Sequence, residues 1–157
     1  MIRREGKVSL SLVKEAKRLK DEDGGYGEQN RDEVWCVFDR DLKRENNNQQ
    51  NFNAAITLAK NNNINLAISN DAFELWFLLH YEYYSSCTHR NELIKKLEDR
   101  LGAKYQKNSY DMYEKLIDKQ SDAIKRAKNL WDNCCQDHNV NPSTTVFELV
   151  EMLNSFL

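Results

Sequence analysis

The sequence predicts an α/β fold, in which a parallel sheet with a β-α-β crossover is followed by a mostly helical C-terminal half. Two short apolar runs, at 34–38 and 64–68, have the length and the β-branched or aromatic content of buried strands. An amphipathic stretch at 49–60 lies between them. After residue 88, apolar side chains recur at helical spacing. These observations together favour the α/β class.

Length and composition narrow the class of protein. The chain has 157 residues and a net charge of −2, which suits one domain with a helical extension. It holds no run of about 18 apolar residues and no recognisable secretory signal, so we expect neither a transmembrane helix nor export. The four cysteines form no CxxC pair and no zinc-finger spacing, which favours reduced thiols. We therefore expect a cytoplasmic protein.

The first predicted elements are a helix, a loop and a strand. Residues 8–20 place their apolar side chains on one helical face and lysine and arginine on the other. The glycine-rich segment 21–30 predicts a loop. The run at 34–38 does not alternate between apolar and polar residues, so we expect a strand that is covered on both faces.

A β-α-β unit follows from the next two segments. The helix expected at 49–60 has Phe52, Ala55 and Ala59 on one face, and the strand expected at 64–68 comes directly after it. Because the two strands fall within about 35 residues, they should run parallel with a right-handed crossover.

Helices account for the rest of the chain. Asn70 is expected to cap the first of them, with Asp71 and Glu74 in its first turns. Thr145 and Glu148 have the spacing of a capping box at the start of the last one. The expected helical ranges are 71–84, 90–101, 110–117, 121–135 and a final helix from 146.

Charge and domain organisation change along the chain. We expect an α/β core at 1–86 and a helical extension at 87–157 that packs on it, unless the two form one continuous domain. Residues 90–130 carry 11 Lys or Arg against 7 Asp or Glu, whereas 131–157 carry four acids and no Lys or Arg. This polarity indicates a nucleic-acid surface, a self-complementary contact, or simply a solvated face.

Polar side chains follow both predicted strands. Asp39 and Asp41 come after the first strand, and Ser69, Asn70 and Glu74 come after the second. The carboxyl ends of parallel strands share one edge of a sheet, and open α/β sheets bind ligands there. We therefore expect both clusters to converge on one crevice.

The acidic pair is a candidate metal site. Asp39 and Asp41 can direct two carboxylates at one Mg²⁺ or Mn²⁺ ion, because side chains two apart on an extended chain point to the same side. Arg40, Lys43 and Arg44 could then attract a phosphate group, with Ser69 and Asn70 across the crevice. Capping or surface ion pairs would explain the same acidic residues equally well.

Two further residues carry weaker signals. Glu74 is a candidate catalytic group, although a glutamate in a first helical turn often serves only the helix dipole. His80 is a possible site residue, but it lies between large apolar side chains, where a hydrogen-bonded core histidine is the commoner explanation.

Four segments give the sequence a specific resemblance. VWCVFDRD at 34–41, AISNDAFELWFLLHY at 67–81, AIKRAK at 123–128 and NPSTTV at 141–146 together resemble the RloB-like proteins. The AbiLii-type abortive-infection proteins look like relatives. The resemblance implies a Toprim-like domain followed by family-specific helices, in which Asp39 and Asp41 match the DxD motif that holds Mg²⁺ during phosphodiester chemistry.

The sequence departs from the family pattern at its start. Family members usually open with a strand that ends in Glu-Gly, and Toprim enzymes place a catalytic glutamate there. Glu5 and Gly6 follow only four residues, too few for a buried strand, so we expect that the catalytic segment is lacking and the Toprim-like sheet truncated. The open edge of such a narrow sheet favours a homodimer. A histidine frequent in the family after NPSTTV is replaced by Phe147.

The resemblance implies a role in restriction or abortive phage infection. One hypothesis is a Mg²⁺-dependent nuclease or phosphotransfer enzyme. The alternative is a non-catalytic defence subunit that acts through a partner protein, such as a co-encoded ATPase, or through nucleic acid bound by residues 90–130.

Overall fold

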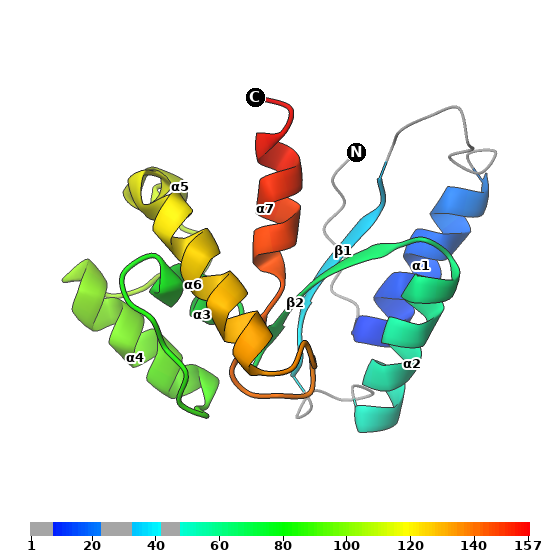
Figure 1. Ribbon diagram of the computed structural model, residues 1–157, viewed down its shortest axis with the longest axis horizontal. Helices are drawn as coiled ribbons and strands as arrows, with labels where there is room; N and C mark the ends of the chain where they lie inside the picture. The colour runs from blue at the N-terminus through cyan, green and yellow to red at the C-terminus, as the bar shows by residue number, and fades with distance from the viewer. Residues whose placement is uncertain (1–7, 23–32, 42–47) are drawn as a thin grey trace. The chain divides into compact units, whose positions relative to one another are not determined.

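The computed structural model describes residues 8–22, 33–41 and 48–157, which form a mixed α/β structure (Figure 1). The chain divides into two compact units, Met1–Ala67 and Ile68–Leu157. The predicted α/β class is confirmed. The predicted domain boundary after residue 86 lies inside the second unit and stays a prediction. No described helix combines the length and the apolar character that crossing a bilayer requires.

The first unit contains two helices that pack together on one strand. Figure 1 shows the helices side by side. Buried residues from both of them and from the strand form the core of this unit: Val13, Cys36, Ala55, Ala59 and Ile64. The elements are α1 (Ser9–Glu22), β1 (Trp35–Asp39), α2 (Gln49–Asn61) and the start of β2 (Asn65–Asn70). The helices at 8–20 and 49–60 and both strands are therefore confirmed to within two residues at each end.

Strands β1 and β2 are neighbours in the sheet. The backbone N–H of Asn65, the first residue of β2, donates to the C=O of Val34, the residue before β1, over 2.8 Å. The beginnings of the two strands therefore lie together, as parallel pairing requires. Because α2 connects them, the β-α-β unit is confirmed.

The prediction that β1 is covered on both faces is wrong. Cys36 is 3% exposed, whereas its neighbour Val37 is 44% exposed. Successive side chains on a strand point to opposite faces, and the core residues of α1 and α2 both pack on the Cys36 side. The apolar run at 34–38 thus reflects one buried face, and its lack of alternation is misleading.

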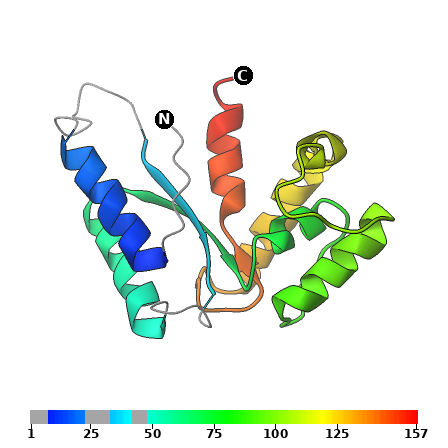
Figure 2. The same cartoon turned by 180° about the vertical axis from the view of Figure 1, so that it is seen from behind.

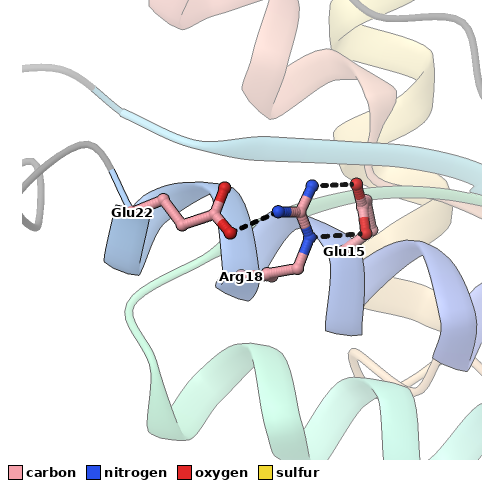
Figure 3. Close-up of polar contacts among 3 residues, drawn as sticks. All are labelled: Glu15, Arg18 and Glu22. Carbon is pink, nitrogen blue, oxygen red and sulfur yellow. Dashed lines mark hydrogen bonds and ion pairs between the residues drawn. The ribbon is translucent and has the colours of Figure 1, made fainter.

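The solvent side of α1 is stabilised by a charge network around Arg18 (Figure 3). The guanidinium donates from Nη2 to Glu15 over 2.7 Å and from Nε over 3.1 Å, and its Nη1 pairs with Glu22. These residues are three and four positions apart, so they neighbour one another on the helix surface. Arg18 is about half exposed, so solvent screening keeps the contribution of this network to stability small.

The second unit is mostly helical. α3 packs against both α4 and α6, and α6 also contacts β3 and α7 (Figure 2). Gly102, with φ +66°, ends α4 in the left-handed conformation that glycine adopts without a Cβ clash. The elements are α3 (Glu74–Leu79), α4 (Arg90–Leu101), α5 (Met112–Leu116), the 3-10 helix η1 (Ile117–Lys119), α6 (Gln120–Asn133), β3 (Ser143–Thr144) and α7 (Val146–Asn154).

A third strand makes the sheet mixed, so the prediction of a purely parallel sheet is wrong. β3 pairs antiparallel with β2, with Ser69 opposite Thr144 and Asn70 opposite Ser143. The sheet order is β1-β2-β3. Two polar residues after a proline carry no strand signal of their own. The pairing comes from hydrogen bonds to a strand more than 70 residues away.

This pairing also explains why neither Asn70 nor Thr145 makes the predicted side-chain capping bond, although Thr145 does occupy the N-cap position of α7. Asn70 belongs to β2, and its side-chain amide donates to the C=O groups of His138 and Val140, over 3.2 and 2.8 Å. α3 starts only at Glu74 and ends at Leu79, so it is much shorter than the predicted 71–84. The Thr145 hydroxyl makes no capping bond to α7 and instead accepts from the N–H of Ile68 over 3.1 Å.

Candidate functional site

The acidic pair lies where β1 ends. Asp39 is the last residue of the strand, and Asp41 follows two positions later; both side chains are half-buried. Phe38 contacts Phe52 of α2 edge to face, with ring centroids 6.3 Å apart. The Arg40 guanidinium lies 5.3 Å from the same ring and pairs with Gln49. By strand alternation, Asp39 therefore points away from α2.

Arg40 is held by α2 in this arrangement. Its contacts with Gln49 and Phe52 anchor the start of the helix to the end of β1. A role for Arg40 in phosphate binding stays a prediction. Lys43 and Arg44, as well as Glu5 and most of the predicted loop at 21–30, lie outside the described residues.

Ser69 and Asn70 are buried within the second unit. Ser69 is fully buried, and its hydroxyl lies 2.9 Å from the Thr144 hydroxyl. Asn70 is 1% exposed, and its amide nitrogen is used by two backbone carbonyls. Asp71 accepts from the backbone N–H of Arg90, the first residue of α4, over 3.1 Å. These three side chains join β2 to distant segments of the same unit.

Glu74 follows these residues in the chain. It begins α3 and is only 3% exposed. Its position directly after β2, at the start of a helix, keeps Glu74 as a candidate residue of the second unit.

His80 is buried directly after α3. Its Nδ1 donates to the C=O of Trp76 over 2.9 Å, and the two rings meet edge to face at 4.9 Å. Burial lowers the pKa of His80, and the nearby charges of Lys119 and Arg126 lower it further. Backbone hydrogen bonds to Trp76 and Phe77 act in the opposite direction, but the pKa stays below its ordinary value. The ring is therefore neutral near pH 7, with the proton on Nδ1 and the lone pair on Nε2.

Sequence reasoning missed Arg126 and Asn141. Arg126 donates to the C=O groups of Leu79 and His80, over 2.8 and 3.0 Å, at the end of α3. Asn141 exchanges two hydrogen bonds with the backbone of Thr88, over 3.3 and 2.9 Å. Both residues lie in segments that carry the family resemblance, which was the signal available for finding them.

His138 was also missed. Its Nδ1 is buried and has no hydrogen-bond partner within 8–22, 33–41 and 48–157, and its ring lies 4.6 Å from that of Trp131. Burial lowers the pKa of His138 to about 4, with the charge of Asp137 opposing the shift. An isolated histidine after a predicted helix gives no sequence signal of burial.

The predicted site residues fall in both compact units. Asp39 and Asp41 belong to the first unit, whereas Ser69, Asn70, Glu74 and His80 belong to the second, so convergence on one crevice stays a prediction. Within 8–22, 33–41 and 48–157, no three His, Cys, Asp or Glu side chains are grouped closely enough to hold a metal ion. Asp39 and Asp41 are thus a pair of potential ligands.

Comparison with known proteins identifies the family. Searches of the curated proteins and of the solved structures found no significant match. The family model described as RloB-like protein matches residues 2–153, which is nearly the whole chain. Three of the segments that carry the resemblance, 67–81, 123–128 and 141–146, also meet within the second unit, through the β2–β3 pairing and the contacts of Arg126 with α3. The chain belongs to the RloB-like family.

Proposed function

We propose that this protein acts in restriction-associated phage defence as a Mg²⁺-dependent nuclease or phosphotransfer enzyme with a Toprim-like core. Membership in the RloB-like family supports the defence role. The observation that carries the enzymatic part is the position of Asp39, which ends a strand of a parallel β-α-β unit. Ligands of open α/β sheets bind at this end of the strands.

The chemistry of the acidic pair fits a hard divalent cation. Mg²⁺ takes oxygen ligands and often uses only one or two protein carboxylates, with water and substrate phosphate completing its shell. Asp39 and Asp41 would supply those carboxylates, on the side of the chain opposite to Arg40. A bound Mg²⁺ lowers the pKa of a coordinated water and offsets charge on a phosphodiester.

Glu74 is the proposed further catalytic group. A carboxylate at the start of α3, directly after β2, suits either a third ligand or a base that takes a proton from water. Ser69 and Asn70 would serve by fixing the end of β2, since their side chains are used within the second unit.

The test is metal-dependent cleavage by the purified full chain. Plasmid DNA and tRNA are incubated with Mg²⁺, Mn²⁺ or a chelator, and the wild type is compared with Asp39→Asn and Asp41→Asn. We expect cleavage that needs the metal and falls at least about 100-fold in both variants, since metal ligation contributes several kcal/mol to the transition state. Calorimetric titration with Mn²⁺ should show weaker binding in both.

Asp21→Asn is the matched control. Asp21 is an exposed carboxylate of α1 in the same unit that pairs with Lys17 at the surface, so its loss should leave cleavage unchanged. Equal cleavage by the wild type and Asp39→Asn would refute the proposal. A chain that neither binds Mn²⁺ nor cleaves, but forms a stable complex with a co-encoded ATPase, would support the non-catalytic subunit instead.

A further inference from the structure

We propose that a surface of the second unit, built from three tyrosines and the cations around them, binds single-stranded nucleic acid. The tyrosines belong to residues 81–84, here called the tyrosine segment, which lies between α3 and α4. The inference narrows the nucleic-acid surface expected at 90–130 to this segment and its neighbours. It does not depend on catalysis by Asp39 and Asp41.

Cations from distant parts of the unit lie over the rings of the tyrosine segment. The ammonium group of Lys96, in α4, is 5.2 Å from the centre of the Tyr84 ring. That of Lys119, the last residue of η1, is 5.4 Å from the centre of the Tyr81 ring. The negative face of an aromatic ring attracts a cation but leaves its charge in place. Both lysines therefore stay available to an anion.

The acid of the tyrosine segment does not neutralise these lysines. Glu82 pairs instead with Arg100 of α4. Within 8–22, 33–41 and 48–157, no carboxylate pairs with Lys96 or Lys119. The same holds for Arg126 of α6, whose hydrogen bonds go to backbone carbonyls at the end of α3. The segment is thus surrounded by an excess of positive charge.

The pKa of His80, the residue before the tyrosine segment, agrees with this excess. Burial is the largest cause that lowers it, and the charges of Lys119 and Arg126 lower it further. Both of these charged groups are positive, and each disfavours a second positive charge on the ring. A phosphate group would be attracted to the same place.

The exposed ring area points to single strands among the possible polyanions. Tyr83 is 40% exposed, and its hydroxyl accepts from Asn133 of α6 over 3.1 Å. Unpaired bases stack on such aromatic rings, whereas a duplex keeps its bases stacked on one another. An acidic peptide backbone offers charge without bases. We therefore assign base stacking to Tyr83 and phosphate contacts to Lys96 and Lys119.

The test is binding of fluorescent polyanions to the full chain, followed by anisotropy with a chelator present so that no metal-dependent cleavage occurs. The probes are single-stranded DNA and RNA of about 16 nucleotides, the matching DNA duplex, and poly-glutamate. A single strand should bind at least about fivefold tighter than the duplex or poly-glutamate, which is the effect of one stacked base. Binding of either single strand fits, because bases and phosphates are common to both.

Variants separate stacking from charge. Tyr83→Leu should weaken binding at least about fivefold, whereas Tyr83→Phe keeps the ring and should stay within about twofold of the wild type. Lys96→Gln with Lys119→Gln should reduce the slope of log affinity against log salt by about 0.7 for each lysine. The matched control is Lys14→Gln with Lys60→Gln, which removes two exposed lysines from the first unit and should leave the slope unchanged.

Three outcomes would overturn the inference. The first is binding of poly-glutamate or the duplex as tight as that of both single strands, and the second is unchanged binding by Tyr83→Leu. The third is an unchanged salt slope in the double variant of Lys96 and Lys119. Circular dichroism checks that each variant is folded. A chain that binds single strands but never cleaves them would refute only the proposed nuclease activity.

Discussion

The hydroxyl groups of Ser69 and Thr144 meet in the interior of the second unit, 75 positions apart in the sequence. Both residues are fully buried. The sequence predicted a phosphate-binding role for Ser69, because a polar residue after an apolar run is typical of a strand end. The strand in fact continues through Asn70, since β3 supplies partners that a local pattern cannot reveal.

This hydroxyl pair gives a prediction at the residue scale. Thr144→Val removes one partner and leaves the Ser69 hydroxyl buried without its bond, so the free energy of unfolding should fall by about 1–3 kcal/mol. Ser69→Ala should act similarly. The double variant should lose less than the sum of the two, which urea unfolding of all four proteins will measure. Strict additivity would show that the two hydroxyls do not interact.

Helix periodicity predicted the bounds of several helices accurately, but it did not predict where α3 ends or that β3 forms. α4 has the predicted bounds, because Leu93 and Leu97 face the core and Gly102 ends the helix. α3 was predicted too long, because residues 81–84 continue the aromatic pattern outside any regular helix. β3 was missed because its two residues gain their structure from β2.

Asp71 gives a prediction at the element scale. The sequence placed it in the first turn of α3, but its carboxylate accepts from the N–H of Arg90 and so stabilises the start of α4. Asp71→Ala should lower the free energy of unfolding by about 1 kcal/mol, the typical effect of losing a helix cap. Asp71→Asn keeps an acceptor and loses only the charge, so its effect should be smaller. Equal effects in urea unfolding would contradict this role.

At the scale of the whole molecule, family membership was predictable because long, unusual strings are distributed along most of the chain. The convergence of the acidic pair with Ser69, Asn70 and Glu74 was inferred from sheet topology alone. The parallel β1–β2 pair supports the premise of that inference. However, the side chains of Ser69, Asn70 and Asp71 have partners in distant segments that no local pattern could supply.

Part of the response of the whole molecule to pH follows from two histidines, the buried His80 and the half-buried His138. The pKa of His138 is lowered from 6.5 to about 4 by burial, so between these values the unfolded chain binds a proton that the folded chain does not. Stability due to His138 is therefore complete above about pH 6.5 and is lost as the pH falls. The lowered pKa of His80 acts in the same direction.

His138→Gln should remove most of this dependence. From about pH 7 to pH 5, the linkage for His138 amounts to about 2 kcal/mol of unfolding free energy in the wild type. Urea unfolding at the two pH values should therefore show a smaller loss in the variant, although carboxylates contribute equally to both proteins. An NMR titration should place the His138 midpoint near pH 4, below the value of an exposed histidine. A midpoint near 6.5 would mean that the ring is solvated, and the variant would then lose as much stability as the wild type.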